Sequence, residues 1–258
     1  DLHSFPTRRS SDLSANLWLL DTGSYSCRGD KNSYGCIEDE QVEWYNKESA
    51  KFKEQYGTHA QHLAFIHFPI PEYMYVYNAG TVFGFKGEPV CCPMHNTGFF
   101  EAAKKNGDIT SIYCGHDHRN NYGGWLDGIE LIYGRKTGEG SYGPNGPNIP
   151  YTQHGGRVIV LSETLDGDGN LIVNREHYVL NQDKTTQLDI PVKINVTDPQ
   201  IVCRAYSKPP KSSNLDSQIL LGTFIGGSAI LLLAVGYFII KRLKKPKEIK
   251  NPAALLTV

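Results

Sequence analysis

The sequence has no excess of charge of either sign. Its 26 Lys and Arg residues nearly balance its 27 Asp and Glu residues, which gives a formal net charge of −1. Six of the basic residues follow position 240, so the first 240 residues hold 20 basic and 26 acidic side chains. A mildly acidic chain lacks the basic surface that binds a phosphate backbone, and we therefore exclude nucleic acid as a partner.

Charged residues are absent from residues 219–240, ILLGTFIGGSAILLLAVGYFII. A helix of this length is roughly 33 Å long, which is enough to cross a hydrocarbon core of about 30 Å. The run therefore predicts a single transmembrane helix, with the lipid bilayer as a partner. The basic segment KRLKKPK follows it, so we expect residues 241–258 to be a cytosolic tail and the preceding domain to be extracellular or lumenal.

An initiating methionine and a signal peptide are also lacking, although this topology requires a signal. Residues 1–13, DLHSFPTRRSSDL, resemble a translated sequencing adapter, and we expect them to be non-native. Two observations agree with an outside or lumenal domain. Asn195 begins an N-glycosylation sequon, and all six cysteines precede the apolar run, on the side where disulfides persist. We predict a Cys27–Cys36 pair, with free, buried cysteines as the alternative.

Strand and helix patterns alternate in the first half of the chain, and strands dominate later. Apolar periodicity predicts a helix over 38–56, and Asn96 or Thr97 caps a second helix over 96–105. Short apolar runs predict strands over 16–21, 62–68, 109–114, 129–133, 157–161 and 171–179. This order indicates an α/β fold whose later strands form a second, more antiparallel sheet. We expect residues 186–218 to be an extended stalk.

A pair of histidines follows one predicted strand in Gly115-His116-Asp117-His118. Histidines at i and i+2 of an extended chain point to the same side, with Cα atoms about 6.6 to 7 Å apart. That spacing suits two metal ions about 3.5 to 4 Å apart. His67 lies near the end of another predicted strand and could reach the same sheet edge. Ordinary loop histidines are the alternative, but the strand context favours metal binding.

The segments NLWLLDTG, HFPIPEY, NTGFFEA, GHDHRNNYGG and YGRKTGEGSYG together resemble the calcineurin-like metallophosphoesterases. The branch that they resemble is the one related to purple acid phosphatases, over its C-terminal part. The resemblance implies a partial domain over 14–185, belonging to a four-layer α/β/β/α sandwich. It implies that His67 and His116 bind the second of two metal ions, of Fe, Zn or Mn, and that His118 binds the first. It also implies a phosphoester substrate hydrolysed by water.

The family's earlier blocks, D-x-H, GD and GNH[DE], have no fitting counterpart upstream of His67. We therefore expect this chain by itself to be inactive, with no catalytic residue of its own, and phosphatase or phosphodiesterase activity to belong to a longer parent protein. Asp117 is expected either to orient a metal ligand or to point to solvent. Asn120, Asn121 and Tyr122 are expected to shape the pocket rim, with ordinary loop solvation as the alternative.

Two other functions compete with this interpretation. The segment LLDTGS, beginning at Leu19, matches the active-site turn of pepsin-like aspartic peptidases, but that chemistry needs two carboxylates and the sequence has no second D-[ST]-G. A membrane-tethered binding module that keeps the fold without catalysis is the other alternative. The presence of all three histidines weighs against it.

Overall fold

A mixed five-stranded sheet forms the centre of the described domain. The computed structural model describes residues 13–58, 60–143, 153–168, 171–204 and 256–257. The sheet order is β1-β4-β6-β8-β7, in which the first four strands are parallel and β7 is antiparallel at the edge. Its strands are β1 Ala15–Leu19, β4 Gln61–Phe65, β6 Ile109–Cys114, β7 Gly123–Leu126 and β8 Ile129–Tyr133.

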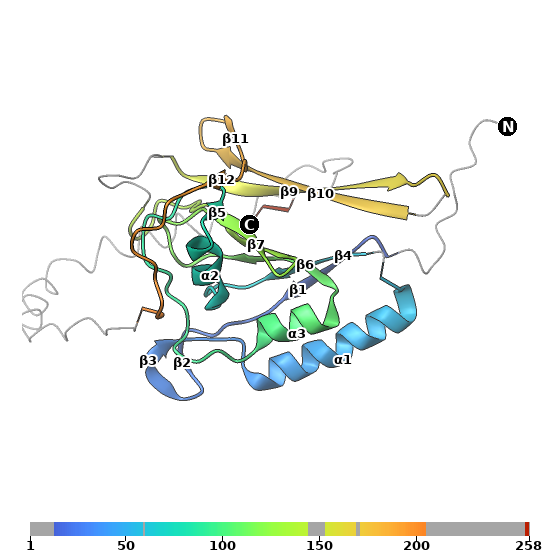
Figure 1. Ribbon diagram of the computed structural model, residues 1–258, viewed down its shortest axis with the longest axis horizontal. Coiled ribbons are helices and arrows are strands. Elements are labelled where there is room, and N and C mark those ends of the chain that lie inside the picture. Colours follow the sequence, from blue (N-terminus) through green and yellow to red (C-terminus); the bar gives the residue numbers. More distant parts are fainter. Residues whose placement is uncertain (1–12, 59, 144–152, 169–170, 205–255, 258) are drawn as a thin grey trace, which may run out of the picture. The chain divides into compact units, whose positions relative to one another are not determined.

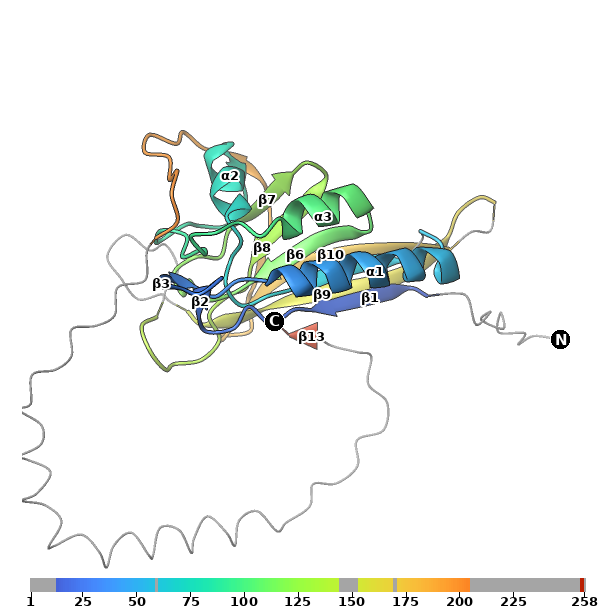
Figure 2. The ribbon, with the colours of Figure 1, turned by 90° about the horizontal axis from the view of Figure 1, so that it is seen from below.

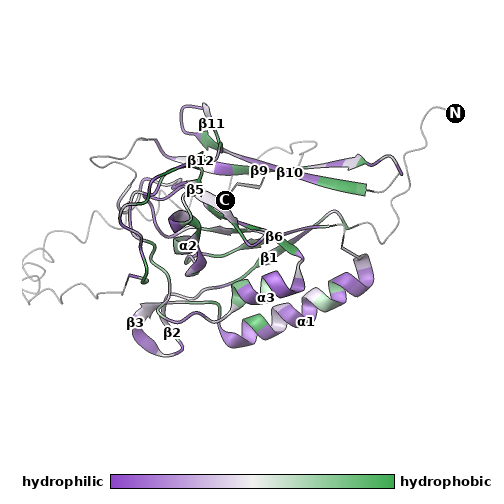
Figure 3. Cartoon of the chain, in the orientation of Figure 1, coloured by the Kyte–Doolittle hydropathy of each residue, from purple (hydrophilic) through white to green (hydrophobic). Residues whose placement is uncertain are grey.

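Two helices, α1 (Asp39–Tyr56) and α3 (Phe99–Asn106), cover one face of this sheet (Figures 1 and 2). Helix α1 begins with a capping box between Glu38 and Gln41 and presents mostly hydrophilic residues (Figure 3). Its buried Tyr45 packs edge-on against Trp18 of β1 and Phe99 of α3, at ring-centroid distances of 5.0 and 5.4 Å. These aromatic contacts fix both helices on the sheet.

A second, antiparallel sheet lies over the opposite face (Figure 1). Its order is β11-β10-β9-β13, and its core is a long hairpin of β9 and β10. Apolar residues of both sheets, including Leu63, Ile132 and Ile159, pack together between them. The strands are β9 Gly155–Leu165, β10 Leu171–Asn181, β11 Thr186–Leu188 and β13 Leu256–Thr257.

A group of buried charges also joins the two sheets. Arg157 forms an ion pair with Asp189, and both side chains are almost fully buried. His177 lies between Asp189 and Glu130, with nitrogen–oxygen distances of 2.6 and 3.2 Å. Arg175 pairs with Glu130 at 2.6 Å. Each buried charge therefore has a partner of opposite sign, as low-dielectric surroundings require.

Smaller elements surround the sheet. A hairpin of β2 (Tyr25–Cys27) and β3 (Asp30–Tyr34) is closed by the Cys27–Cys36 disulfide, which confirms that prediction. The remaining elements are helix α2 (Glu72–Asn78) and the paired strands β5 (Thr81–Val82) and β12 (Val192–Lys193).

The predicted strands all form, but residues 129–133 were assigned to the wrong sheet. This strand inserts between β6 and β7 of the first sheet, and all five of its residues are buried because both of its faces are covered. The predicted start of the second helix, at residue 96, is also wrong. The side chain of Asn96 accepts a hydrogen bond from Gly98 N in a turn, and helix α3 begins at Phe99. Helix α2 was not predicted.

The predicted stalk over 186–218 is wrong for its first part. Residues 186–188 pair with β10, and residues 192–193 pair with β5. Cys203 forms a disulfide with Cys92, 111 residues earlier in the chain. Backbone pairing and a covalent bond therefore hold the chain against the domain as far as residue 203, beyond the predicted boundary at 185.

No helix within the described ranges is long and apolar enough to cross a membrane. The apolar run 219–240 lies outside the described residues, as do nearly all of the leader 1–13 and of the basic tail 241–258. The transmembrane helix stays a prediction.

Candidate metal centre

The carboxyl ends of the four parallel strands border one cavity of about 530 Å³. In open α/β sheets, ligands commonly bind outside the carboxyl ends of parallel strands, where the loops leave a crevice. The cavity is lined by Leu19, Leu20, Asp21, Phe65, Ile66, His67, Cys114, Gly115, His116, Asp117, His118, Gly134, Arg135 and Lys136.

His67 and His116 lie side by side in this cavity, with ring centroids 5.3 Å apart. Strand pairing continues past β4 and β6, because Gly115 N donates to the carbonyl oxygen of His67 at 3.1 Å. This bond brings the two strand ends together. The structure thus places His67 beside His116 at the predicted edge, although metal ligation itself stays a prediction.

His116 has a left-handed backbone conformation, with φ of 68°. Such a conformation is costly for a residue with a side chain and is often found at functional sites. The ring packs against Phe68 at 4.4 Å and Tyr34 at 4.9 Å between centroids. Burial, reinforced by the nearby His67 and His118, lowers the pKa of His116 to about 4. Its imidazole is therefore neutral near pH 7, which is the form that binds a metal ion.

The pKa of His67 is also lowered, first by burial and then by the neighbouring His118. All three predicted ligands thus lie within electrostatic range of one another. A cation bound between His67 and His116 would meet unprotonated rings at neutral pH and would not have to displace protons from them.

His118 is held by Tyr142. Its Nδ1–H donates to the carbonyl oxygen of Tyr142 at 2.7 Å, since a carbonyl can only accept. The two rings stack at 4.3 Å. Histidine ligands of metal ions commonly donate one ring N–H to a carbonyl in this way, which leaves the other nitrogen for the ion. His118 therefore fits the role of a ligand through Nε2.

Asp117, between the two histidines, does not point to solvent, because it is only 2% exposed. Its Oδ2 accepts hydrogen bonds from Cys91 N at 3.1 Å and from the Tyr133 hydroxyl at 2.6 Å. Burial raises the pKa of Asp117 to about 6, although these bonds oppose the rise. The carboxylate thus fixes the histidine loop against the neighbouring chain segment.

Asn120, Asn121 and Tyr122 do not lie at the pocket rim, and that prediction is wrong. All three are fully buried. The side-chain oxygens of Asn120 and Asn121 accept backbone N–H bonds from residues 85, 87 and 88, and Tyr122 donates to the carbonyl of Tyr73. The sequence predicts a loop at residues 120–122, but in the structure the two asparagine side chains accept hydrogen bonds from backbone N–H groups of the 85–88 segment.

Four further residues at the site were not predicted to belong to the metal centre. Asp21, Arg135 and Lys136 line the cavity. Each follows a short apolar run, in LLD and YGRK, which is the same sequence signal that identified the histidines. Tyr142 gave no such signal, because it lies in a Gly-rich segment with no periodicity.

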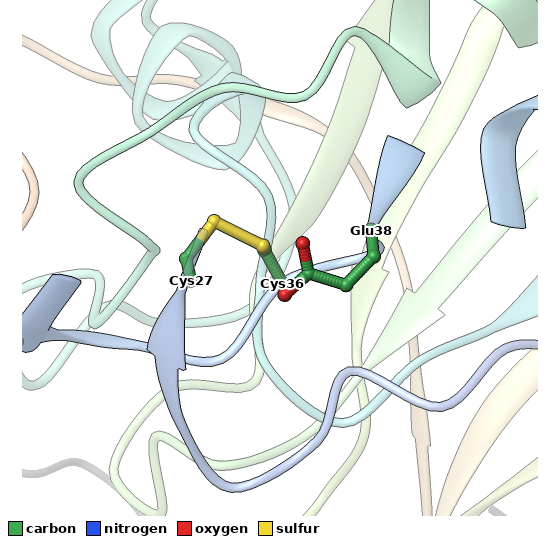
Figure 4. A group of neighbouring side chains, drawn as sticks. All are labelled: Cys27, Cys36 and Glu38. Atoms are coloured by element: carbon green, nitrogen blue, oxygen red, sulfur yellow. A yellow bond between two sulfur atoms is a disulfide. The ribbon is translucent and has the colours of Figure 1, made fainter. Parts of the chain in front are cut away.

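A second cluster of potential ligands, Cys27, Cys36 and Glu38, lies beside the β2–β3 hairpin (Figure 4). The two sulfur atoms are bonded to each other in the disulfide. They are therefore not available as thiolates, and this cluster is structural.

Sequence comparison relates about half of the chain to known proteins. No protein-family model matches the chain. Two Arabidopsis thaliana proteins resemble it: "Probable inactive purple acid phosphatase 29", 33% identical over 138 residues, and "Probable inactive purple acid phosphatase 14", 31% identical over 139. Each match covers 51% of this chain, and 36% and 35% of the relative. The chain thus spans about a third of the length of the curated relatives that it matches.

Among solved structures, a dimetal phosphatase from Danio rerio matches 63% of this chain and 40% of its own, with a TM-score of 0.33 and 12% identity. This likeness is too low to bear on the fold. The sequence similarity to purple acid phosphatases over half the chain supports a metallophosphoesterase-related fold.

Proposed function

We propose that this chain carries the histidine-bearing part of a phosphoester-hydrolysing metal site. The observation that carries the proposal is the convergence of His67, His116 and His118 on one cavity, with the Nδ1 of His118 already bonded to a carbonyl. The sequence similarity to two proteins named as probable inactive purple acid phosphatases supports a site derived from that family. We also propose that the two sheets are the central layers of a four-layer α/β/β/α sandwich.

In this proposal His67 and His116 hold one metal ion and His118 holds the other, with Fe, Zn or Mn as candidates. Bound ions would polarise the phosphoryl group and lower the pKa of water. Lys136 lines the same cavity, and its positive charge favours a phosphate anion there. Lys136 Nζ donates to Gly140 O at 2.6 Å, and among the described residues its other two N–H donors have no partner and could bind a ligand.

Turnover by this chain alone is not part of the proposal. It offers three of the imidazole ligands, and the D-x-H, GD and GNH[DE] blocks have no fitting counterpart before His67. Hydrolysis is therefore assigned to a longer parent protein. The word "inactive" in the relatives' names favours a second candidate function, a binding module that holds metal and phosphoester without hydrolysis.

Calorimetric titration of the chain with Mn²⁺ or Zn²⁺ tests the proposal. His67→Ala and His118→Ala should each weaken binding at this centre. His95→Ala is the matched control, because His95 is largely exposed and its ring pairs with Asp30 at 3.2 Å. Unchanged binding in both variants would refute the proposed centre. Hydrolysis of p-nitrophenyl phosphate by the chain itself would refute the assignment of turnover to a longer protein.

We propose further that residues 219–240 anchor the protein in a membrane, with the described domain outside the cell or in a lumen. Asn195 is exposed, two residues after β12, and so is accessible to a glycan. In a secretory expression system, peptide-N-glycosidase should shift the mobility of the protein but not of Asn195→Gln. Alkaline carbonate should leave the chain with the membranes and should release a version ending at residue 218.

A further inference from the structure

We propose that Cys91, His116 and Asp117 form a separate binding site for one transition-metal ion of the Zn²⁺ type. This site shares His116 with the candidate metal centre but uses neither His67 nor His118. It stands whether or not the chain takes part in phosphoester hydrolysis.

The three side chains already converge. One ligand atom of each, the Cys91 sulfur, a ring nitrogen of His116 and a carboxylate oxygen of Asp117, lie within 4.8 Å of one another. Around a tetrahedral zinc ion such atoms lie about 3.3 to 3.7 Å apart, so a closure of at most about 1.5 Å would complete the site. Both His116 and Asp117 line the cavity, which gives an ion a route of entry.

The carboxylate of Asp117 also favours a bound cation. Its Oδ2 is occupied by Cys91 N and the Tyr133 hydroxyl, but its Oδ1 is buried and makes no hydrogen bond to any described residue. A buried carboxylate oxygen without a partner is destabilising, and a bound cation would satisfy it.

The thiol of Cys91 is also suited to bind a metal ion. Cys91 and Cys114 are the free thiols in the described part of the chain. Cys114 lies fully buried beside the hydroxyl of Tyr73, whereas Cys91 lies against the Asp117 carboxylate and the Tyr34 hydroxyl. Its thiol is within hydrogen-bonding range of both of these groups and lies 3.7 Å from Pro89 O. On metal binding the S–H proton would leave to solvent and the sulfur lone pair would form the metal bond.

The ligand chemistry selects the class of ion. A thiolate and an imidazole favour zinc and similar ions over magnesium or calcium, which prefer oxygen ligands alone. Three protein ligands leave a fourth position open to water or an exogenous ligand. The Cys27, Cys36 and Glu38 cluster has similar geometry but offers no thiolate, because its sulfur atoms form a disulfide.

Titration of the purified chain with Co²⁺ under anaerobic conditions tests this site. Co²⁺ bound to a thiolate produces a charge-transfer band in the near ultraviolet, which Zn²⁺ should abolish by displacement. Cys91→Ser should remove the band and weaken Zn²⁺ binding roughly ten- to hundredfold, and Asp117→Asn should weaken it to a similar extent. Cys114→Ser is the matched control, a second buried free thiol, and should keep the band.

The outcomes separate the two metal proposals. A band that persists in His67→Ala and His118→Ala supports the separate site even if the phosphoesterase proposal fails. Co²⁺ binding without the band, lost in His67→Ala or His118→Ala, would overturn the separate site and leave the first proposal intact. Absence of any band from the unaltered chain, or a band that survives in folded Cys91→Ser, would also overturn it. The unaltered chain and Cys114→Ser decide the question if Cys91→Ser does not fold.

Discussion

His118 and Tyr142 lie face to face, with ring centroids 4.3 Å apart and planes 22° apart. The carbonyl of Tyr142 also accepts the Nδ1–H of His118, and the Tyr142 hydroxyl lies 2.9 Å from a carboxylate oxygen of Glu88. Stacking fixes the plane of the imidazole, and the hydrogen bond fixes its tautomer. A residue 24 positions away along the chain therefore presents one nitrogen of His118 to the cavity.

Removal of the Tyr142 ring should weaken metal binding at His118. Tyr142→Ala loses the stack and the bond to Glu88, and we expect metal affinity to fall about tenfold, at the lower end of losses seen when outer-shell partners of ligands are removed. Tyr142→Phe keeps the stack and should stay close to the unaltered chain. Calorimetry with Mn²⁺ measures both. Tyr75→Ala, which removes a half-exposed tyrosine on α2, should have no effect.

Asp189 should be essential for stability, although the sequence placed it in a stalk. Its carboxylate pairs with Arg157 and His177, so Asp189→Ala leaves two buried cationic groups without this partner. Breaking a buried ion pair costs about 3 to 5 kcal/mol. Urea unfolding followed by circular dichroism measures the loss. The exposed Asp168→Ala should change stability by less than about 0.5 kcal/mol, and an equally small change in Asp189→Ala would contradict the observed pairing.

Stability should fall as the pH rises above neutrality because of His177. Burial alone would lower the pKa of His177, but its hydrogen bonds to Asp189 and Glu130 raise it above the ordinary value. A raised pKa stabilises the fold fully below the unfolded value of about 6.5, and this contribution is lost as the pH rises through the folded value. His67 and His116 have lowered pKa values and so act on the acid side instead.

The check is the free energy of unfolding as a function of pH. His177→Gln should flatten the loss above about pH 6.5, while the acid side keeps its slope. If the slope above that pH is the same in His177→Gln as in the unaltered chain, another group is responsible.

The Cys92–Cys203 disulfide should stabilise the fold more than Cys27–Cys36, because it closes a much longer loop. The bonded residues are 111 and 9 positions apart. Loop-closure entropy gives about 4.7 kcal/mol for a loop near 100 residues and about 2.7 kcal/mol for one near 10. Paired Cys→Ser variants of each bond, compared by urea unfolding, measure the difference. Equal losses from the two double variants would contradict the loop-closure argument.

The strand-end histidines could be predicted because a histidine at the end of an apolar strand, preceded by Gly115 in the case of His116, is a local pattern. Parallel pairing then brings His67 beside His116 without further information. The burial of Asn120 and Asn121 could not be predicted, since their partners are backbone groups about 33 to 36 residues away. The spacing of cysteines in a sequence does not reveal which of them are bonded, so the Cys92–Cys203 disulfide could not be predicted either.

The position of residues 129–133 could not be read from the sequence either. A fully buried strand has the same apolar run in either sheet, and only the packing of both faces decides between them. The same limit applies to residues 186–193, whose short strands gain their pairing partners from β10 and β5.

The Cys92–Cys203 bond also decides how the domain would respond to mechanical load. A force applied to the chain after residue 204 is transmitted to Cys203, the next residue toward the N-terminus, and through the disulfide to Cys92. The 110 residues between them, which include β6 to β12, are bypassed and bear no tension. Tension would instead enter the loop that precedes α3, next to Cys91 and the histidine loop, so reduction of this one bond would change which part of the protein yields first.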